Sequence, residues 1–127
     1  MNAEIIYKQN VNDSLLEGLA KKLPVIIAET MEVPGGNLAR LKPEQIMLAF
    51  SQANLRDVGA DIRIMVFAQN NDPRISTEDD RAKTILDRIV KLAGEFGGDY
   101  SVDIRLYLLE IGAAEHPRAV RQERNSF

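Results

Sequence analysis

The stretch DIRIMVFA at residues 61–68 decides the fold class. Its aliphatic side chains recur at every second position, which is the period of a β-strand with one face against a core. Three further stretches are rich in β-forming residues, namely 3–8 (AEIIYK), 45–51 (QIMLAFS) and 102–111 (VDIRLYLLEI). We therefore expect four strands in this chain.

An amphipathic helix is expected after the first of these strands. Asn12, Asp13 and Ser14 are candidate N-caps, and Ser14 with Glu17 stands at the spacing of a capping box, in which two side chains bond the free amides at a helix start. Apolar residues then recur at helical spacing, at Leu15, Leu16, Leu19, Leu23, Ile26 and Ile27. Pro24 lies inside this pattern, and because proline lacks a backbone amide proton we expect a kink or a restart there. The helix should end by residues 33–36.

A second helix is expected between the last two strands. Ser76 and Thr77 precede it as caps, and the acidic residues 78–80 suit the positive end of its dipole. Its apolar stripe comprises Ala82, Ile85, Leu86, Ile89, Ala93 and Phe96, and it ends at Gly97-Gly98. The order β-α-β, repeated once, predicts a single α+β domain over residues 1–115 with a basic tail over 116–127. The similar stretches YKQN (7–10) and FAQN (67–70) favour a duplicated unit.

The two faces of the expected four-stranded sheet differ in their surroundings. One face should lie under both helices and carries Ile46, Leu48, Phe50, Ile62, Ile64, Val66, Ile104, Leu106 and Leu108. The opposite face carries Met47, Ala49, Met65, Phe67, Tyr107 and Leu109, which is too apolar for a surface in contact with water. Two helices do not readily cover both faces of a sheet, so we expect self-association through the second face.

Composition narrows the classes of function. The 127 residues include no cysteine and one histidine, His116, which excludes disulfides and thiolate or histidine-rich metal sites. A net charge of −3 disfavours a dedicated nucleic-acid-binding protein. No apolar run reaches the length of a membrane span, and residues 1–4 lack the features of a signal peptide. We expect a cytoplasmic protein without a metal or cofactor, and with no nucleic-acid or membrane partner.

Two local matches indicate a known family. Lys42-Pro43-Glu44-Gln45 leads into the second strand and is similar to the lysine-proline step of macrophage migration inhibitory factor. Residues 18–24, with Pro34 and Arg40 after them, are similar to the first helix and following loop of 5-carboxymethyl-2-hydroxymuconate isomerase. With the two β-α-β units, these matches make residues 3–115 resemble the tautomerase superfamily. The resemblance implies a homotrimer whose sheets surround a central axis, with sites at subunit boundaries.

The resemblance also implies a set of site residues. It implies that Arg40 and Lys42 bind the carboxylate of a small keto or enol compound, since the corresponding residues of the family line its pocket. Arg63 and Arg105 stand two residues before Met65 and Tyr107 and are candidates for the pocket or a central channel. The alternative for both is an ion pair with Asp61 and Asp103 across strands or subunits. Tyr7 is a candidate proton or hydrogen-bond donor, with packing at a strand end as its alternative.

The chain departs from the family at the catalytic residue. Family members use the secondary amine of an amino-terminal proline, whereas Asn2 follows Met1 here and the first proline is Pro24. Asparagine is too bulky to favour removal of the initiator methionine. An α-amine ordinarily ionises near pH 8, at about the working range of a general base. The Met1 α-amine is therefore the candidate catalytic group.

Three functions remain open from the sequence. The first is a tautomerase-like keto-enol isomerase with non-standard catalysis. The second is a trimer of the same fold that binds a small carboxylate without chemistry, which the missing proline favours. The third is a ferredoxin-like binding domain, which has the same order of elements. Strands 1 and 3 are expected at the centre of the sheet in either fold, so the assembly is expected to distinguish them.

Overall fold

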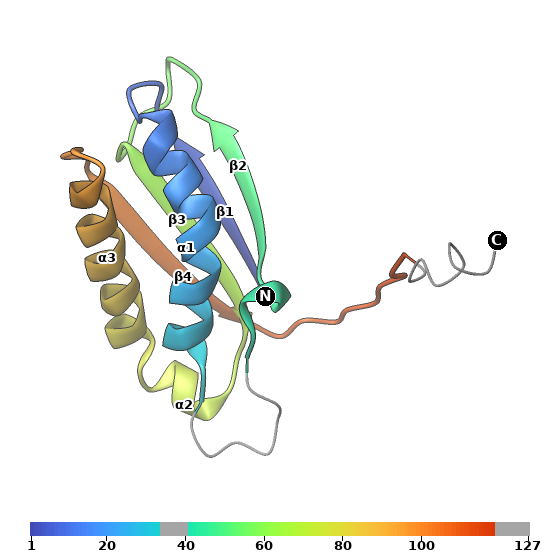
Figure 1. Ribbon diagram of the computed structural model, residues 1–127. Coiled ribbons are helices and arrows are strands. Elements are labelled where there is room, and N and C mark those ends of the chain that lie inside the picture. The colour runs from blue at the N-terminus through green and yellow to red at the C-terminus, as the bar shows by residue number, and fades with distance from the viewer. Residues whose placement is uncertain (34–40, 119–127) are drawn as a thin grey trace.

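The computed structural model describes residues 1–33 and 41–118. Two long helices lie side by side on one face of a four-stranded sheet (Figure 1). The elements are β1 (Asn2–Tyr7), α1 (Asp13–Met31), the 3-10 helix η1 (Pro43–Gln45), β2 (Met47–Gln52), β3 (Ile62–Gln69), α2 (Asp72–Ile75), α3 (Glu78–Glu95) and β4 (Val102–Leu109). The predicted α+β fold of two β-α-β units is confirmed.

The order of the strands is β2-β1-β3-β4. β1 runs parallel to β2, β3 runs parallel to β4, and the two halves join where β1 pairs with β3 in antiparallel fashion. In the split β-α-β unit of a ferredoxin-like domain, another strand separates the two parallel strands. Here the strands of each unit are direct neighbours, so the strand order itself excludes the ferredoxin-like alternative. The expectation that only the assembly would distinguish the folds was wrong.

The pairing defines two ends of the sheet, which we name for the rest of the text. Strands β1 and β2 begin next to Met1, and strands β3 and β4 end there. We call this end of the sheet the Met1 end. The opposite end of the strands, where residues 8–12 and 53–61 connect the elements, is the loop end. α1 finishes and α3 starts at the Met1 end, because each helix runs back along its own half of the sheet (Figure 1).

The core lies between the helices and the sheet. β3 shows the predicted alternation without exception, since Ile62, Ile64, Val66 and Ala68 are buried while the residues between them are not. These side chains pack with those of both helices, and the fully buried large residues are Ile5, Leu15, Leu19, Leu23, Ile27, Met31, Ile62, Ile64, Ile85, Ile89 and Val66. Both helix stripes predicted from the sequence therefore contribute to one core.

The start of α1 uses the first of the three predicted caps, and the predicted capping box of Ser14 and Glu17 does not form the cap. Asn12 is the N-cap, and its Oδ1 accepts a hydrogen bond from Leu15 N at 2.7 Å. Ser14 therefore lies inside the first turn, two residues beyond the cap position. The helix also continues through Pro24 without a restart. Proline costs one helical hydrogen bond, and burial of the apolar face on both sides of Pro24 compensates for this loss.

The second half contains one element that the prediction lacked. Asn71 caps the short helix α2 by accepting a hydrogen bond from Arg74 N at 2.9 Å. Thr77 is at the N-cap position of α3, but its Oγ1 donates to Pro73 O at 2.6 Å and so caps no amide of α3. The acidic residues 78–80 do occupy the first turn, and Gly97 follows the helix with a positive φ of 73°.

The face of the sheet opposite the helices is bare. Met47 is 65% exposed, Tyr107 40% and Leu109 44%, although all three are large apolar or aromatic residues. β2 has no buried residue, and Phe50 remains 36% exposed even on the helix side. The two edges of the sheet, β2 and β4, have no neighbouring strand on their outer sides within residues 1–33 and 41–118. These features agree with the predicted need for a partner.

The segment after β4 does not cover this face. Residues 110–118 are exposed and extend away from the domain (Figure 1). The strand ends at Leu109, two residues earlier than expected. None of the helices formed by the described ranges has the length and apolar character that would let it cross a membrane.

Candidate functional site

Met1 lies at the start of the central strand β1. Its carbonyl accepts a hydrogen bond from Met47 N at 3.0 Å, which ties the first residue to the start of β2. Asn2 then pairs with Met47 on one side and with Phe67 on the other. The Met1 side chain is half-buried and packs against the core. The α-amine is thereby fixed at the Met1 end, near the middle of the sheet.

The turn before β2 brings Lys42 to the same end. Pro43 starts η1 with its φ angle already suitable for a helix. The Gln45 side chain accepts a hydrogen bond from Lys42 N at 2.8 Å, and Gln45 N donates to Lys42 O at 2.9 Å. These two bonds fix the Lys42 backbone, and the exposed ammonium is a point charge available to an anion. Met1 and Lys42 thus lie at the same end of the sheet.

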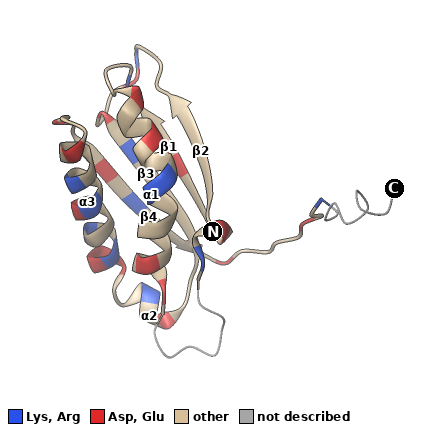
Figure 2. Cartoon of the chain, viewed as in Figure 1, with Lys and Arg blue, Asp and Glu red and all other residues tan. Residues whose placement is uncertain are grey.

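A pair of arginines at this end was missed by the sequence reasoning. Arg74 of α2 donates through Nε to Met31 O at 3.1 Å and through Nη1 to Gln69 O at 2.9 Å. Arg81 of α3 donates through Nη1 to Thr30 O at 2.6 Å and to Glu32 O at 3.1 Å. The two guanidinium groups therefore cap the last carbonyls of α1, where the helix dipole is negative. Figure 2 shows the positive residue of α2 below the end of α1.

The two arginines stand beside the acidic residues Asp72 and 78–80 at the Met1 end. Partial burial lowers the pKa of Arg74, and the neighbouring charge of Arg81 lowers it further. An arginine keeps its proton under these conditions. The signal available in the sequence was Asn71-Asp72-Pro73, a cap followed by a proline early in a helix.

An aromatic pair forms the apolar part of the site. Phe67 and Tyr107 face each other across β3 and β4 on the bare face, with ring centroids 5.1 Å apart and planes inclined by 12°. The pairing register continues this row through Asn2 to Met47. The α-amine of Met1 therefore has cationic residues beyond the sheet end and an apolar row on the bare face.

The other predicted site residues lie elsewhere in the chain. Tyr7 is at the loop end, half-buried and packed against the core, so it shares no site with Met1 within one chain. Arg63 and Arg105 lie on the bare face in adjacent rows. Arg40 lies outside the described residues. His116 is exposed in the extended segment.

Arg105 does pair with Asp103, but within one strand and not across strands or subunits as expected. Arg105 Nε donates to Asp103 Oδ2 at 3.1 Å, and this hydrogen bond, together with the charge of Asp103, raises the pKa of Arg105. Asp61 makes a different contact from the predicted pair with Arg63, since its Oδ2 accepts a hydrogen bond from Ser101 N at 3.0 Å. Arg63 instead lies against the backbone of Gly59.

The part of the surface formed by residues 1–33 and 41–118 includes two clefts that Met1 does not line. One of about 470 Å³ is at the loop end, and one of about 340 Å³ lies between the start of α3 and the edge strand β4. Within residues 1–33 and 41–118, no three acidic, histidine or cysteine side chains converge as metal ligands. The Met1 end holds the α-amine and the cations of Lys42, Arg74 and Arg81, together with the carboxylates of Glu44, Asp72 and residues 78–80.

Comparison with known proteins identifies the fold. No family model matches the sequence, and no curated protein matches it at the sequence level. Solved structures do match, including a malonate semialdehyde decarboxylase inhibited by 3-bromopropiolate, with a TM-score of 0.66 and 11% identity over 99% of this chain and 96% of that chain. A fused 4-OT described as a symmetric trimer has a TM-score of 0.63 and 11% identity over 94% and 96% of the two chains.

A third solved structure agrees. A member of the cis-3-chloroacrylic acid dehalogenase family has a TM-score of 0.60 and 9% identity over 87% of this chain and 76% of that chain. Identities this low show the fold alone. The chain therefore has the tautomerase-like fold that its two β-α-β units and local motifs predicted.

Proposed function

We propose that this chain forms a homotrimer that binds a small carboxylate-bearing keto or enol compound at the Met1 end and tautomerises it. The observation that carries this proposal is the position of the Met1 α-amine. It lies at the start of a central strand, at the same end of the sheet as the turn that carries Lys42. The fold shared with solved enzymes of the tautomerase superfamily supports the assignment.

Trimer formation is supported by the bare face and by the unlike edges of the sheet. A contact between the β2 edge of one copy and the β4 edge of the next is head-to-tail, and such a contact produces a ring when its rotation closes. Copies joined in this way would bury Met47, Tyr107 and Leu109. Two fused 4-OT structures of the same fold are described as symmetric and asymmetric trimers.

Carboxylate binding is supported by the charge at the Met1 end. Lys42 would hold the anion as a point charge, and the unengaged Nη2 atoms of Arg74 and Arg81 would add to the local positive potential. Arg40 remains a proposed anchor on the strength of the family resemblance. Arg63 and Arg105, and Tyr7 from a neighbouring copy, are proposed to line the boundary between subunits.

The proposed chemistry is a proton transfer between two positions of one substrate. The neutral α-amine of Met1 would remove a proton from the carbon next to the carbonyl, and the electron pair of the broken C–H bond would form the enolate. The ammonium would then return the proton to the enolate oxygen, which gives the enol. Cations at this end stabilise the negative charge that develops on oxygen.

Phenylpyruvate tautomerisation tests this proposal. We expect turnover above the buffer rate by the full chain, and a loss of about 10²-fold or more when a residue is added before Met1, because the general base is then displaced. Arg40→Ala and Lys42→Gln should raise KM, while Lys91→Gln on the outer surface of α3 should change nothing. Equal rates for wild type and buffer, with phenylpyruvate and with a hydroxymuconate, would end the catalytic proposal.

The second candidate is a trimer that binds the carboxylate without chemistry. The absence of any proline before Pro24 favours it, because the family's catalytic amine has no counterpart. It predicts saturable binding of phenylpyruvate that Lys42→Gln weakens, with no turnover. A chain that sediments as a monomer at micromolar concentration would contradict both candidates.

A further inference from the structure

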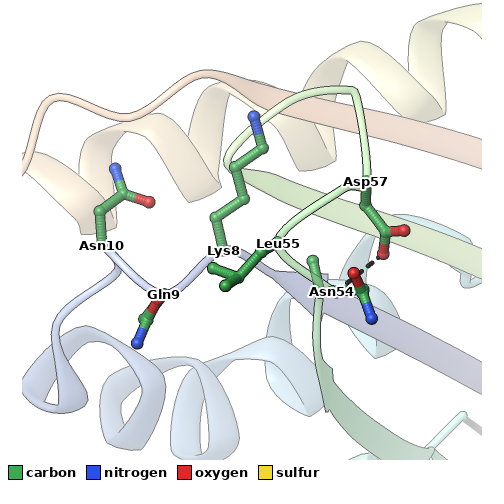
Figure 3. Close-up of a pocket in the computed structure, with 7 residues that line it drawn as sticks. Lys8, Gln9, Asn10, Asn54, Leu55 and Asp57 are labelled. Atoms are coloured by element: carbon green, nitrogen blue, oxygen red, sulfur yellow. Dashed lines mark hydrogen bonds between the residues drawn. The ribbon is translucent and has the colours of Figure 1, made fainter.

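The cleft at the loop end is not used by the proposed function. It lies between the β1–α1 connection and the β2–β3 connection, at the opposite end of the sheet from Met1. Its volume is about 470 Å³, and its walls are formed by Lys8, Gln9, Asn10, Ala53, Asn54, Leu55 and Asp57 (Figure 3). This volume lies within the range of small-molecule sites in proteins, which is about 300–1,000 Å³.

Hydrogen bonds to the strands hold both walls of the cleft in place. Ala53 N donates to Tyr7 O at 2.8 Å, and Lys8 N donates to Asp61 O at 2.8 Å. On the far side, the Tyr100 hydroxyl donates to Asn10 O at 3.3 Å. A ligand would therefore meet walls that are already ordered, which lowers the entropic cost of binding.

The β2–β3 wall is a closed turn. Asp57 Oδ2 accepts a hydrogen bond from Asn54 N at 2.9 Å, and Asp57 N donates to Asn54 O at 2.9 Å. Figure 3 shows the first of these bonds as a dashed line. The Asp57 carboxylate is thereby occupied with its own backbone, and its negative charge is partly compensated.

The other groups of the cleft are available to a ligand. Lys8 is half-buried, and no hydrogen bond or ion pair within the described ranges engages its ammonium. In Figure 3 its side chain extends outwards, with the Asn10 amide on one side and Asp57 on the other. Leu55, which is 87% exposed, gives the cleft an apolar lip. An ammonium donates up to three hydrogen bonds, and each side-chain amide both donates and accepts.

We propose that this cleft is a second ligand site, which takes a small hydroxylated anion. Lys8 binds the carboxylate or phosphate group, the Gln9 and Asn10 amides bond the hydroxyls, and Leu55 covers the carbon chain. Carboxylate and phosphate share this recognition chemistry. The free ammonium among amides excludes an apolar ligand, and the volume limits the size. This site is independent of the chemistry proposed at the Met1 end.

Amide chemical shifts of the full-length chain test this proposal. Separate titrations with glycerate, glycerol 3-phosphate and inorganic phosphate are compared with sodium chloride at matched ionic strength. We expect saturable shifts at residues 8–10 and 53–57 with glycerate or glycerol 3-phosphate, and the tighter of the two identifies the anionic group. Shifts at residues 42–47 would instead report the Met1 end, so the two sites are distinguished.

Lys8→Gln supplies the decisive variant. The substitution keeps the backbone bond of residue 8, so the fold should persist, and a thermal melt checks this. We expect affinity at the loop end to fall about tenfold or more, because a charge-assisted hydrogen bond is lost. Lys91→Gln, which removes the same charge from an exposed position on α3, should bind like wild type. The absence of saturable shifts at the loop end, or unchanged affinity in a folded Lys8→Gln variant, would overturn the proposal.

Discussion

The two faces of the same sheet meet opposite conditions. On the helix side, Ile62, Ile64 and Val66 of β3 have no exposed surface. On the other side, Met47 and Tyr107 also have large side chains, apolar in one case and aromatic in the other. They are nevertheless 65% and 40% exposed. The strands are the same, so the difference arises from what covers each face. The helices α1 and α3 therefore cover one face of the sheet, and the apolar side chains of the other face stay exposed in the single chain.

The largest expected effect comes from the covered face. Ile64→Ala should lower the free energy of unfolding by about 2–5 kcal/mol, because it removes buried methylene groups and leaves a cavity. Urea denaturation followed by circular dichroism measures this loss. Met65→Ala, one residue along β3 and on the bare face, should cost clearly less. Equal losses at the two positions would contradict the difference between the faces.

A charge on the bare face should disrupt assembly and leave the subunit folded. Met47→Glu is expected to shift the mass in sedimentation from three chains to one. At a partner concentration about a hundred times Kd, it should also remove about 3 kcal/mol of apparent stability. Val90→Glu is the matched control, since Val90 is 51% exposed on α3. If Val90→Glu dissociates the protein and Met47→Glu does not, the contact lies on the helix side.

The aromatic stack on the bare face should contribute a smaller amount. Tyr107→Leu keeps an apolar side chain but removes one ring of the pair that stacks on Phe67 at 5.1 Å. We expect a coupling energy of about 0.5–1.5 kcal/mol between the two positions. A double-mutant cycle with Phe67→Leu, measured by urea denaturation, isolates this term. Additive losses would show that the rings contact without net stabilisation.

The smallest effect is expected at the exposed ion pair of the same face. Arg105→Gln breaks the bond to Asp103, but both side chains are solvated in the single chain and water replaces the contact. The unfolding free energy of the isolated subunit should not change measurably in urea denaturation. A clear loss that appears only at concentrations where the protein is assembled would place Arg105 inside the subunit boundary.

Local sequence patterns predicted much of the fold, and β3 shows why. Its alternation reports directly which side chains are buried, because strand geometry sends neighbouring residues to opposite faces. The sequence left three candidate caps for α1, because Asn12, Asp13 and Ser14 are all suitable caps, and the structure uses Asn12. α2 was missed because four residues carry too little periodicity to be detected.

The candidate site was predictable only in part. The register of β1 and β2 places Met1 and the turn with Lys42 at the same end of the sheet. Arg74 reaches Met31 O across 43 positions of sequence, and no local pattern reports such a contact. The loop-end cleft likewise depends on two connections that meet only once the strands have paired.

The unlike edges of the sheet have a consequence for mixtures of variants. In a head-to-tail ring, every junction uses one β2 edge and one β4 edge, so each copy takes part in two different contacts. A copy with a defective β2 edge can still pair its intact β4 edge with the β2 edge of one neighbour. Its own β2 edge, however, cannot pair with the β4 edge of another copy. Co-expression of a β2-defective and a β4-defective variant should therefore yield pairs and no closed ring, so neither defect can be complemented by the other.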